Sequence, residues 1–327
     1  MKSKIIIALF IVIASVAYSQ KKDSLLNIYT KALMANPKDA AILQKRGFEY
    51  FDNQAFDLAI SDFQSAILIN SKDPKNFSGL GSSFLAKEDY MKAIESYTKA
   101  IVLDPKFVNA YYFRAVAYEF SNDFKKAIDD YTQVLNLKPG SVDALLGRGA
   151  AYQSILDYNK ALDDFNQVVL LDENNAQAYI NIASIYDSQD DYLQAEDDFS
   201  KALKIEPDNI EALLGRGCTM QMNEKDKKAK EDFDRVIALD SLNAEAYIRR
   251  GAIFEKEEDY KNAMSDYNKV IAINPKDADV WLLKGMLCEK YNFIDEAVES
   301  YRRFVEFAPK GDKEVKAIKK KIIEIDK

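Results

Sequence analysis

Residues 105–139 read PKFVNAYYFRAVAYEFSNDFKKAIDDYTQVLNLKP, and the rest of the chain repeats this pattern every 34 residues. Places in the repeat are numbered from Val108, which is place 1. Aromatic residues stand at places 4, 11 and 24, alanines at places 8 and 20, and a proline at place 32. Steps of 34 recover the pattern from residue 40 to residue 311, which gives eight copies without insertion or deletion.

Three places of the repeat hold the same kind of residue in every copy: small residues at places 8 and 20, and an aromatic residue at place 24. Place 8 is glycine in six copies and alanine in the other two, and place 24 is always phenylalanine or tyrosine. Such agreement excludes chance, so the chain is an array of internal repeats. Place 20 is alanine in every copy: Ala59, Ala93, Ala127, Ala161, Ala195, Ala229, Ala263 and Ala297.

The spacing of these places predicts two helices in each copy. Places 4, 8 and 11 share one helical face, and places 20, 24 and 27 share a face of a second helix. The small residues at places 8 and 20 lack bulk where the helices should cross, so the two backbones can approach closely. Proline at place 32 ends the second helix because it has no N–H group to continue it.

These features resemble the tetratricopeptide repeat, and the resemblance covers nearly all of the chain after its first residues. It implies an all-α fold, a right-handed superhelical solenoid of helix-turn-helix repeats whose inner groove is lined mainly by the first helices. Because one hairpin cannot bury its apolar face alone, neighbouring repeats must stack. The predicted repeats are residues 40–73, 74–107, 108–141, 142–175, 176–209, 210–243, 244–277 and 278–311.

Residues 1–19 have the features of a secretory signal peptide. Lys2 and Lys4 are followed by an apolar run of 13 residues and by small residues before a cleavage site at Gln20. We therefore expect an exported protein, either periplasmic or secreted. The apolar run is short for a membrane span, and an uncleaved anchor is the alternative.

The two flanks of the array predict single helices. Residues 20–39 carry the second half of a further copy, so we expect a lone second helix there that docks on the first hairpin. Residues 312–327 predict a capping helix, and its stripe consists of Val315, Ile318, Ile322 and Ile325. Its lysines lie mostly outside this stripe. A basic amphipathic helix can also lie on an anionic membrane, and membrane association is considered for this helix alone.

In five copies an arginine at place 7 is accompanied by an aspartate at place 23. We interpret these residues as ion pairs that brace the two helices of a hairpin. The alternative is a row of arginines that binds phosphates or carboxylates, but such arginines would not need an aspartate in the same repeat. The pairs are Arg46 with Asp62, Arg114 with Asp130, Arg148 with Asp164, Arg216 with Asp232, and Arg250 with Asp266.

The composition offers little for catalysis. The chain has no histidine, which removes Ser-His-Asp and Cys-His sites and histidine metal ligands. The Gly-Arg-Gly strings at 147–149 and 215–217 fall within first helices, so they predict packing glycines and not a phosphate loop. The two cysteines, Cys218 and Cys288, lie in different repeats and predict no disulfide. We expect no enzyme activity, no metal site and no cofactor.

Candidate binding residues follow from the resemblance, which assigns places 2, 5, 9, 12 and 13 of the first helix to the groove. Place 5 is never basic and place 9 is never asparagine, so the carboxylate clamp of some relatives is absent. Aromatics beyond those the repeat needs predict partner anchors, with packing against the neighbouring repeat as the alternative. Acidic residues at place 12 predict a preference for a basic or mixed-charge segment. The aromatic candidates are Phe48, Phe51, Tyr112, Phe113 and Phe120, and the acidic candidates are Glu119, Asp187, Glu255 and Glu289.

Without the signal peptide the chain has 43 basic and 53 acidic residues, a net charge of −10. This balance argues against general nucleic-acid binding, which requires neutralisation of phosphates. We predict a non-catalytic scaffold that binds a protein or peptide in its concave groove and is monomeric until the partner is added. The alternative is a structural subunit of an envelope or secretion complex that assembles through its convex face or ends, which predicts oligomers. An enzyme would need a site without histidine.

Overall fold

The computed structural model describes residues 25–326, and every regular element in that range is an α-helix. The prediction of an all-α chain of helical hairpins is therefore confirmed. The expected signal peptide at residues 1–19 lies outside the described residues. Between residues 25 and 326, no helix is long and apolar enough to cross a membrane.

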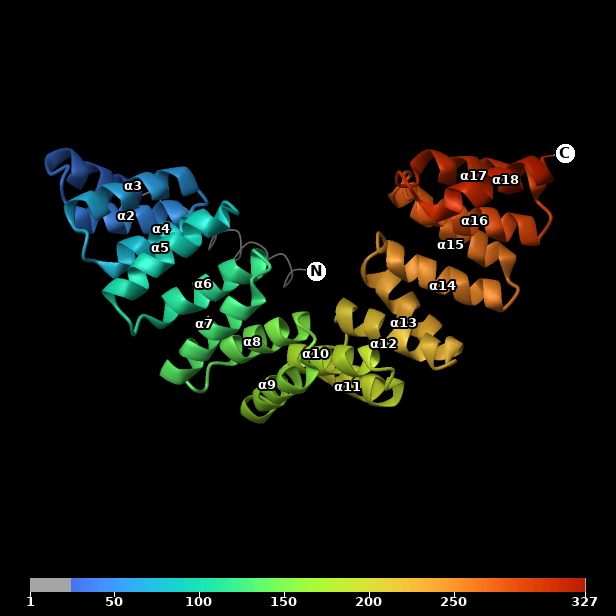
Figure 1. The fold of residues 1–327 in the computed structure, drawn as a ribbon, viewed down its shortest axis with the longest axis horizontal. Coiled ribbons are helices and arrows are strands. Elements are labelled where there is room, and N and C mark those ends of the chain that lie inside the picture. The colour runs from blue at the N-terminus through green and yellow to red at the C-terminus, as the bar shows by residue number, and fades with distance from the viewer. Residues whose placement is uncertain (1–24, 327) are drawn as a thin grey trace, which may run out of the picture. The chain divides into compact units, whose positions relative to one another are not determined.

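The chain forms two compact units, the first ending at Leu171 and the second starting at Asp172. In each unit the helices pack mainly on the next helix along the chain (Figure 1). The right-handed superhelix expected for the whole chain stays a prediction. The first unit contains a helix at residues 25–35, α2 (Ala40–Asp52), α3 (Phe56–Ile69), α4 (Pro74–Ala86), α5 (Tyr90–Leu103), α6 (Val108–Phe120), α7 (Phe124–Leu137), α8 (Val142–Ser154) and α9 (Tyr158–Leu171). The second contains α10 (Ala176–Ser188), α11 (Tyr192–Ile205), α12 (Ile210–Met222), α13 (Asp226–Leu239), α14 (Ala244–Lys256), α15 (Tyr260–Ile273), α16 (Ala278–Lys290), α17 (Ile294–Phe307) and α18 (Lys313–Ile325).

The helices begin and end at the same places in all eight copies. First helices occupy places 1–13 and second helices places 17–30. The turn between them always has a residue with positive φ at place 15, as at Asn122 (58°) and Leu156 (63°). Side chains other than glycine and asparagine adopt this left-handed conformation only at an energetic cost. The turn is therefore set by the packing of the two helices and not by a glycine.

The aromatic ring at place 24 fills the crossing of the two helices. A Cβ atom added to Gly149, at place 8, would lie 2.5 Å from the ring of Phe165 in the same repeat. A Cβ atom added to Gly215, at place 6, would lie 2.3 Å from the ring of Phe199 in the preceding repeat. Each ring is thus held between its own hairpin and the next first helix. The interpretation of the Gly-Arg-Gly strings as packing glycines is confirmed.

The terminal helices cover the ends of the array. In the helix at residues 25–35, Leu33 packs in one apolar cluster with Leu43 and Ala66 of the first repeat. In α18, Ile318 is buried in a cluster with Tyr301 and Phe304 of α17. The apolar stripe expected for the last helix is therefore turned toward the protein.

Candidate partner-binding site

A pocket of about 210 Å³ opens between α6, the end of α7 and the start of α8. Tyr112 and Phe113 form its aromatic wall, and Asn109 lies one turn earlier on α6. Tyr112 and Asn109 occupy places 5 and 2, which the resemblance assigned to the groove. The pocket also reaches Asp143 on α8 and Lys138 after α7. Two of the aromatic candidates are therefore brought together at one accessible hollow.

Ring contacts on three helices hold this aromatic wall. Tyr112 and Phe113 meet edge to face with ring centroids 5.3 Å apart. Tyr112 also packs edge to face on Tyr131 of α7 at 5.7 Å, and Phe113 stacks on Tyr97 of α5 at 6.2 Å. Phe113 nevertheless remains 37% exposed. Tyr112 and Phe113 thus pack on neighbouring helices and also border an open pocket, and their role as partner anchors stays a prediction.

The other three aromatic candidates lie elsewhere. Phe120 stacks flat on Tyr90 of the preceding repeat, with centroids 5.3 Å apart, although 61% of it is exposed. Phe48 packs edge to face on Phe63, and Phe51 packs on the ring of Phe56 at the start of α3. Only the contact of Phe120 is with a neighbouring repeat, as the packing alternative expects, whereas those of Phe48 and Phe51 lie within the first repeat. None of the three lines the pocket that contains Tyr112.

The acidic candidates at place 12 have partners within the protein. Glu119 accepts a hydrogen bond of 2.7 Å from the Tyr131 hydroxyl, and Glu255 accepts one of 3.3 Å from the Tyr267 hydroxyl. In both repeats the donor is the tyrosine at place 24 of the same hairpin.

The remaining two acids are also engaged. Glu289 accepts from Tyr301 at 2.5 Å and from Lys321 at 2.8 Å. Asp187 lies in a repeat with phenylalanine at place 24 and accepts instead from Thr219 at 2.6 Å. The place-12 acids therefore have a structural role, which the sequence analysis did not anticipate. Glutamate at place 12 accompanies three of the four tyrosines at place 24, and this pairing in the sequence could have indicated the hydrogen bond between them.

The surroundings of Glu119 and Glu289 shift the pKa values of these two acids in opposite directions. Burial raises the pKa of Glu119, and the hydrogen bond from Tyr131 offsets only part of that rise. Burial acts in the same direction on Glu289, but hydrogen bonds from Lys321 and Tyr301 outweigh it and lower its pKa. Glu119 is the more deeply buried of the two, and Lys321 supplies Glu289 with a positive charge that Glu119 does not have.

The pocket beside Tyr112 carries negative charge. Burial raises the pKa of Tyr112, and the negative charges of Asp143 and Glu119 raise it further. Asp143 is exposed and makes no hydrogen bond or ion pair with any described residue. An aromatic wall beside a free carboxylate suits a lysine or arginine side chain, which both groups attract. Lys138 also lines the pocket and partly offsets the negative charge of Asp143.

Each arginine at place 7 meets its aspartate at place 23. Arg114 donates from Nε and Nη2 to the two carboxylate oxygens of Asp130, both at 2.7 Å. The rings of Tyr111 and Tyr118 flank this guanidinium at 5.7 and 5.9 Å. The same two-point contact joins Arg46 to Asp62, Arg148 to Asp164, Arg216 to Asp232, and Arg250 to Asp266.

The remaining nitrogen of each arginine reaches the preceding repeat. Nη1 of Arg114 donates to the Thr98 hydroxyl at 2.9 Å, and Nη1 of Arg148 to the Thr132 hydroxyl at 3.1 Å. The acceptor always stands at place 25, and the others are Thr30, Ser200 and Asp234. Each arginine therefore joins its own hairpin to the previous one. Since all three of its nitrogen atoms are engaged, this row does not offer free guanidinium groups to a ligand.

The described residues hold no cluster of three or more acidic, cysteine or histidine side chains able to bind a metal ion. Cys288 is buried and Cys218 is partly buried, and burial raises the pKa of both thiols. A raised pKa leaves little of the reactive thiolate at neutral pH.

Comparison with known families matches four segments of the chain. Models described as tetratricopeptide repeat match residues 108–141, 176–209 and 244–277, and a model described as TPR repeat matches residues 81–119. Three of the matched segments coincide with predicted repeats, and the fourth, residues 81–119, covers parts of two neighbouring repeats. A search of curated protein sequences gives no significant match.

Solved structures show the same fold. A tetratricopeptide repeat protein from Parabacteroides merdae is 19% identical, covers 77% of this chain and 98% of its own, and superimposes with a TM-score of 0.58. PilF from Pseudomonas aeruginosa is also 19% identical, over 65% of this chain and 97% of its own, with a TM-score of 0.57. At these identities the likeness concerns the fold alone.

Proposed function

Because the chain is a tetratricopeptide repeat protein, a family whose members are generally protein-interaction scaffolds, we propose that it binds a peptide segment of a partner protein. The segment lies on the first helices, and the pocket at Tyr112 and Phe113 is its anchor point. The protein has no catalytic activity of its own and is monomeric until the partner binds.

The observation that carries this proposal is the pocket itself. Tyr112 and Phe113 are fixed by Tyr97 and Tyr131, so they are ordered before a partner arrives. Pre-ordered aromatic side chains lose little conformational entropy on binding and commonly dominate the affinity of an interface. The free carboxylate of Asp143 favours a partner segment with a basic residue beside an apolar one.

The test is affinity capture from an envelope extract with the mature chain, residues 20–327. The variant Tyr112→Ala with Phe113→Ser removes the aromatic wall, and Asp143→Asn removes the carboxylate alone. Asp279→Asn is the matched control, because Asp279 stands at the same place of a distant repeat. We expect both pocket variants, with circular dichroism unchanged, to lose a partner that the parent and the control retain. Equal capture by all four proteins would refute the proposal.

A second function is favoured by exposed second-helix residues of the first unit, although the third repeat has Asn136 at the same place. Four second-helix residues at place 29 are large, apolar and open: Met34 (77% exposed), Leu68 (88%), Val102 (75%) and Leu170 (86%). A row of this kind suits a structural subunit that assembles side by side with other proteins. This function predicts oligomers of the isolated protein that Leu68→Glu with Val102→Glu dissociates. Light scattering at increasing concentration distinguishes it from groove binding.

Export is part of the proposal and rests on residues 1–19. The basic start, apolar run and small-residue cleavage site support a signal peptide. Expression of the full chain, followed by fractionation and N-terminal sequencing, tests it. The expected mature protein begins at Gln20 and leaves the cytoplasm. An unprocessed N-terminus in the cytoplasmic fraction would contradict it.

A further inference from the structure

One side of α18 offers a position where another helix could pack, and no described helix occupies it. By the repeat register α18 is a first helix, with Val315 at place 4 and Lys319 at place 8. In the eight hairpins, places 4 and 8 face the second helix of the same repeat. The ring of Phe165 lies against place 8 in this way in the fourth repeat, and Val102 and the place-4 residue Phe77 line one hollow in the second repeat.

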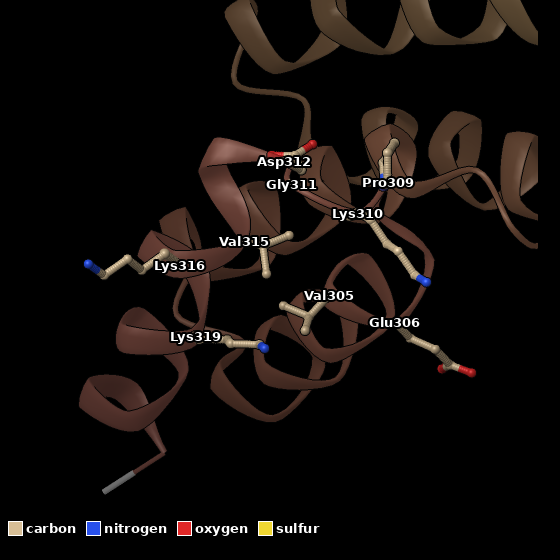
Figure 2. A pocket seen from close by; sticks show the side chains of 10 residues that line it. Val305, Glu306, Pro309, Lys310, Gly311, Asp312, Val315, Lys316 and Lys319 are labelled. Carbon is tan, nitrogen blue, oxygen red and sulfur yellow. The ribbon is translucent and has the colours of Figure 1, made fainter.

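A pocket of about 580 Å³ occupies this position on α18. Val315 of α18 and Val305 of α17 lie toward each other across it, and Lys319 lies beside them (Figure 2). Lys310 and Lys316 extend outward at its rim (Figure 2). The pocket thus has an apolar floor on two helices and a basic border, which suits an amphipathic helix with acidic residues around its apolar face.

The lysines of this border outnumber the two acids that line the pocket. Lys310, Lys316 and Lys319 form no ion pair with any described residue. The two acids that line the pocket are already engaged: Glu306 with Arg303 at 3.0 Å, and Asp312 as the cap that accepts from the backbone N–H of Glu314 at 2.7 Å. An incoming carboxylate therefore meets free ammonium groups.

The arrangement disfavours two other occupants. Apart from Val315, the apolar stripe of α18 packs on α17, with Ile318 only 9% exposed, so it is not available to enter a membrane. The lone second helix of another copy, residues 25–35, carries Lys31 and no acidic residue, so its charge does not complement the lysines.

From these contacts the geometry points to a second binding surface, at which α17 and α18 hold an acidic amphipathic helix of a partner protein. This surface lies in the second unit and is independent of the pocket at Tyr112. Its partner has a charge opposite to that of the peptide proposed for the pocket. One molecule therefore holds two segments of different chemistry.

The test uses a labelled peptide with the sequence of α11 carrying Lys201→Glu and Lys204→Glu. This peptide has the alanine and phenylalanine of a second helix, five carboxylates and no basic residue. Its binding to the full-length protein is measured by fluorescence anisotropy. The variant Lys316→Glu with Lys319→Glu reverses two pocket lysines, and Lys313→Glu with Lys320→Glu is the control with equal net charge on the same helix.

We expect saturable binding that falls about tenfold or more in the pocket variant, because like charges then face each other, and by less than about twofold in the control. Absence of saturable binding would overturn the proposal, and so would an equal loss in both variants, which would mean general charge attraction. Binding of phosphatidylserine vesicles without binding of the peptide would assign the lysines to a lipid surface instead. Self-association abolished by Lys316→Glu with Lys319→Glu would make the occupant a second copy.

Discussion

The arginine at place 7 should behave as a unit with the aspartate at place 23, and Arg114 with Asp130 offers the sharpest case. Only 16% of the Arg114 side chain and 6% of the Asp130 side chain are exposed. Burial alone would lower the pKa of Arg114, but the contacts with Asp130 outweigh it and raise that pKa. The charge of Arg114 is thus tolerated in this position because Asp130 is there.

One repeat of this chain shows how the arginine–aspartate pair can be replaced. The second repeat has Leu80 at place 7 and Ser96 at place 23, and both are buried. Its serine hydroxyl donates to the Lys92 carbonyl at 2.7 Å, so no polar group is left without a partner. Arg114→Leu with Asp130→Ser therefore copies a solution that already works in the neighbouring hairpin.

The expected free energies of unfolding follow from these environments. Asp130→Ser leaves a mostly buried guanidinium without its carboxylate, and Arg114→Leu leaves a buried carboxylate without its cation. Loss of one partner from a buried pair costs about 3–5 kcal/mol. We expect about 3 kcal/mol for Asp130→Ser, since Arg114 keeps its bond to Thr98 and some contact with water. The double variant should cost less than about 2 kcal/mol, because replacing a whole buried pair by well-packed residues is close to neutral.

Urea unfolding followed by far-ultraviolet circular dichroism measures these differences, and hydrogen exchange of α6 and α7 locates them. Local exchange is needed because a repeat array can unfold in parts. The control is Lys99→Ala, which breaks an exposed pair with Glu95 and should cost less than about 1 kcal/mol. The reasoning would be refuted if the losses in unfolding free energy of the two single variants added up to that of the double variant. It would also be refuted if the single variants were as stable as the parent.

Three further outcomes are expected. Gly215→Ala should destabilise the protein by about 1–3 kcal/mol in thermal or urea unfolding, because its Cβ would meet the Phe199 ring at 2.3 Å, whereas Gly140→Ala, with no atom within 4 Å, should not destabilise it. Leu156→Asn should raise stability by about 1 kcal/mol, because Leu156 has a φ of 63° and is 70% exposed, and a lower unfolding midpoint would contradict this. Burial raises the pKa of Glu119 above its ordinary value of 4.5, so its contribution to stability falls as pH rises through the folded pKa. Glu119→Gln should therefore be more stable than the parent at neutral pH, and this gain should vanish below pH 4.5; a gain that persists there would exclude the explanation.

The fold could be predicted from the sequence because its signals are local and repeated. Alanine at place 20 and glycine at place 8 mark the helix crossing, and 34-residue steps fix the helix bounds without knowledge of distant contacts. The arginine–aspartate pairs were also visible, since both residues are present or absent together in seven of the eight copies. The contact from Arg114 to Thr98 was not anticipated, because its two ends lie in different repeats and the acceptor is a threonine, a serine or an aspartate.

The candidate site was only partly predictable. Tyr112 and Phe113 were chosen as aromatics in excess of the repeat, and they line the pocket. Phe120 satisfied the same criterion but stacks on Tyr90, because a helical face in the sequence does not show which neighbouring ring covers it. The acids at place 12 were interpreted as a ligand field, whereas the hydroxyl at place 24, such as that of Tyr131, gives them a structural partner. Side-chain length and direction decide such contacts, and spacing alone does not contain them.

Site-directed photocrosslinking tests the central proposal, that the partner binds on the first helices at the Tyr112 pocket. A photoreactive amino acid replaces Asn109, which is exposed and lines the pocket, or Leu68, which is exposed on a second helix. Crosslinking is carried out in cells and the products are identified by mass spectrometry. The proposal predicts a discrete heterologous product from position 109 and none from position 68. A product from position 68 alone would contradict it and would favour assembly through the second helices.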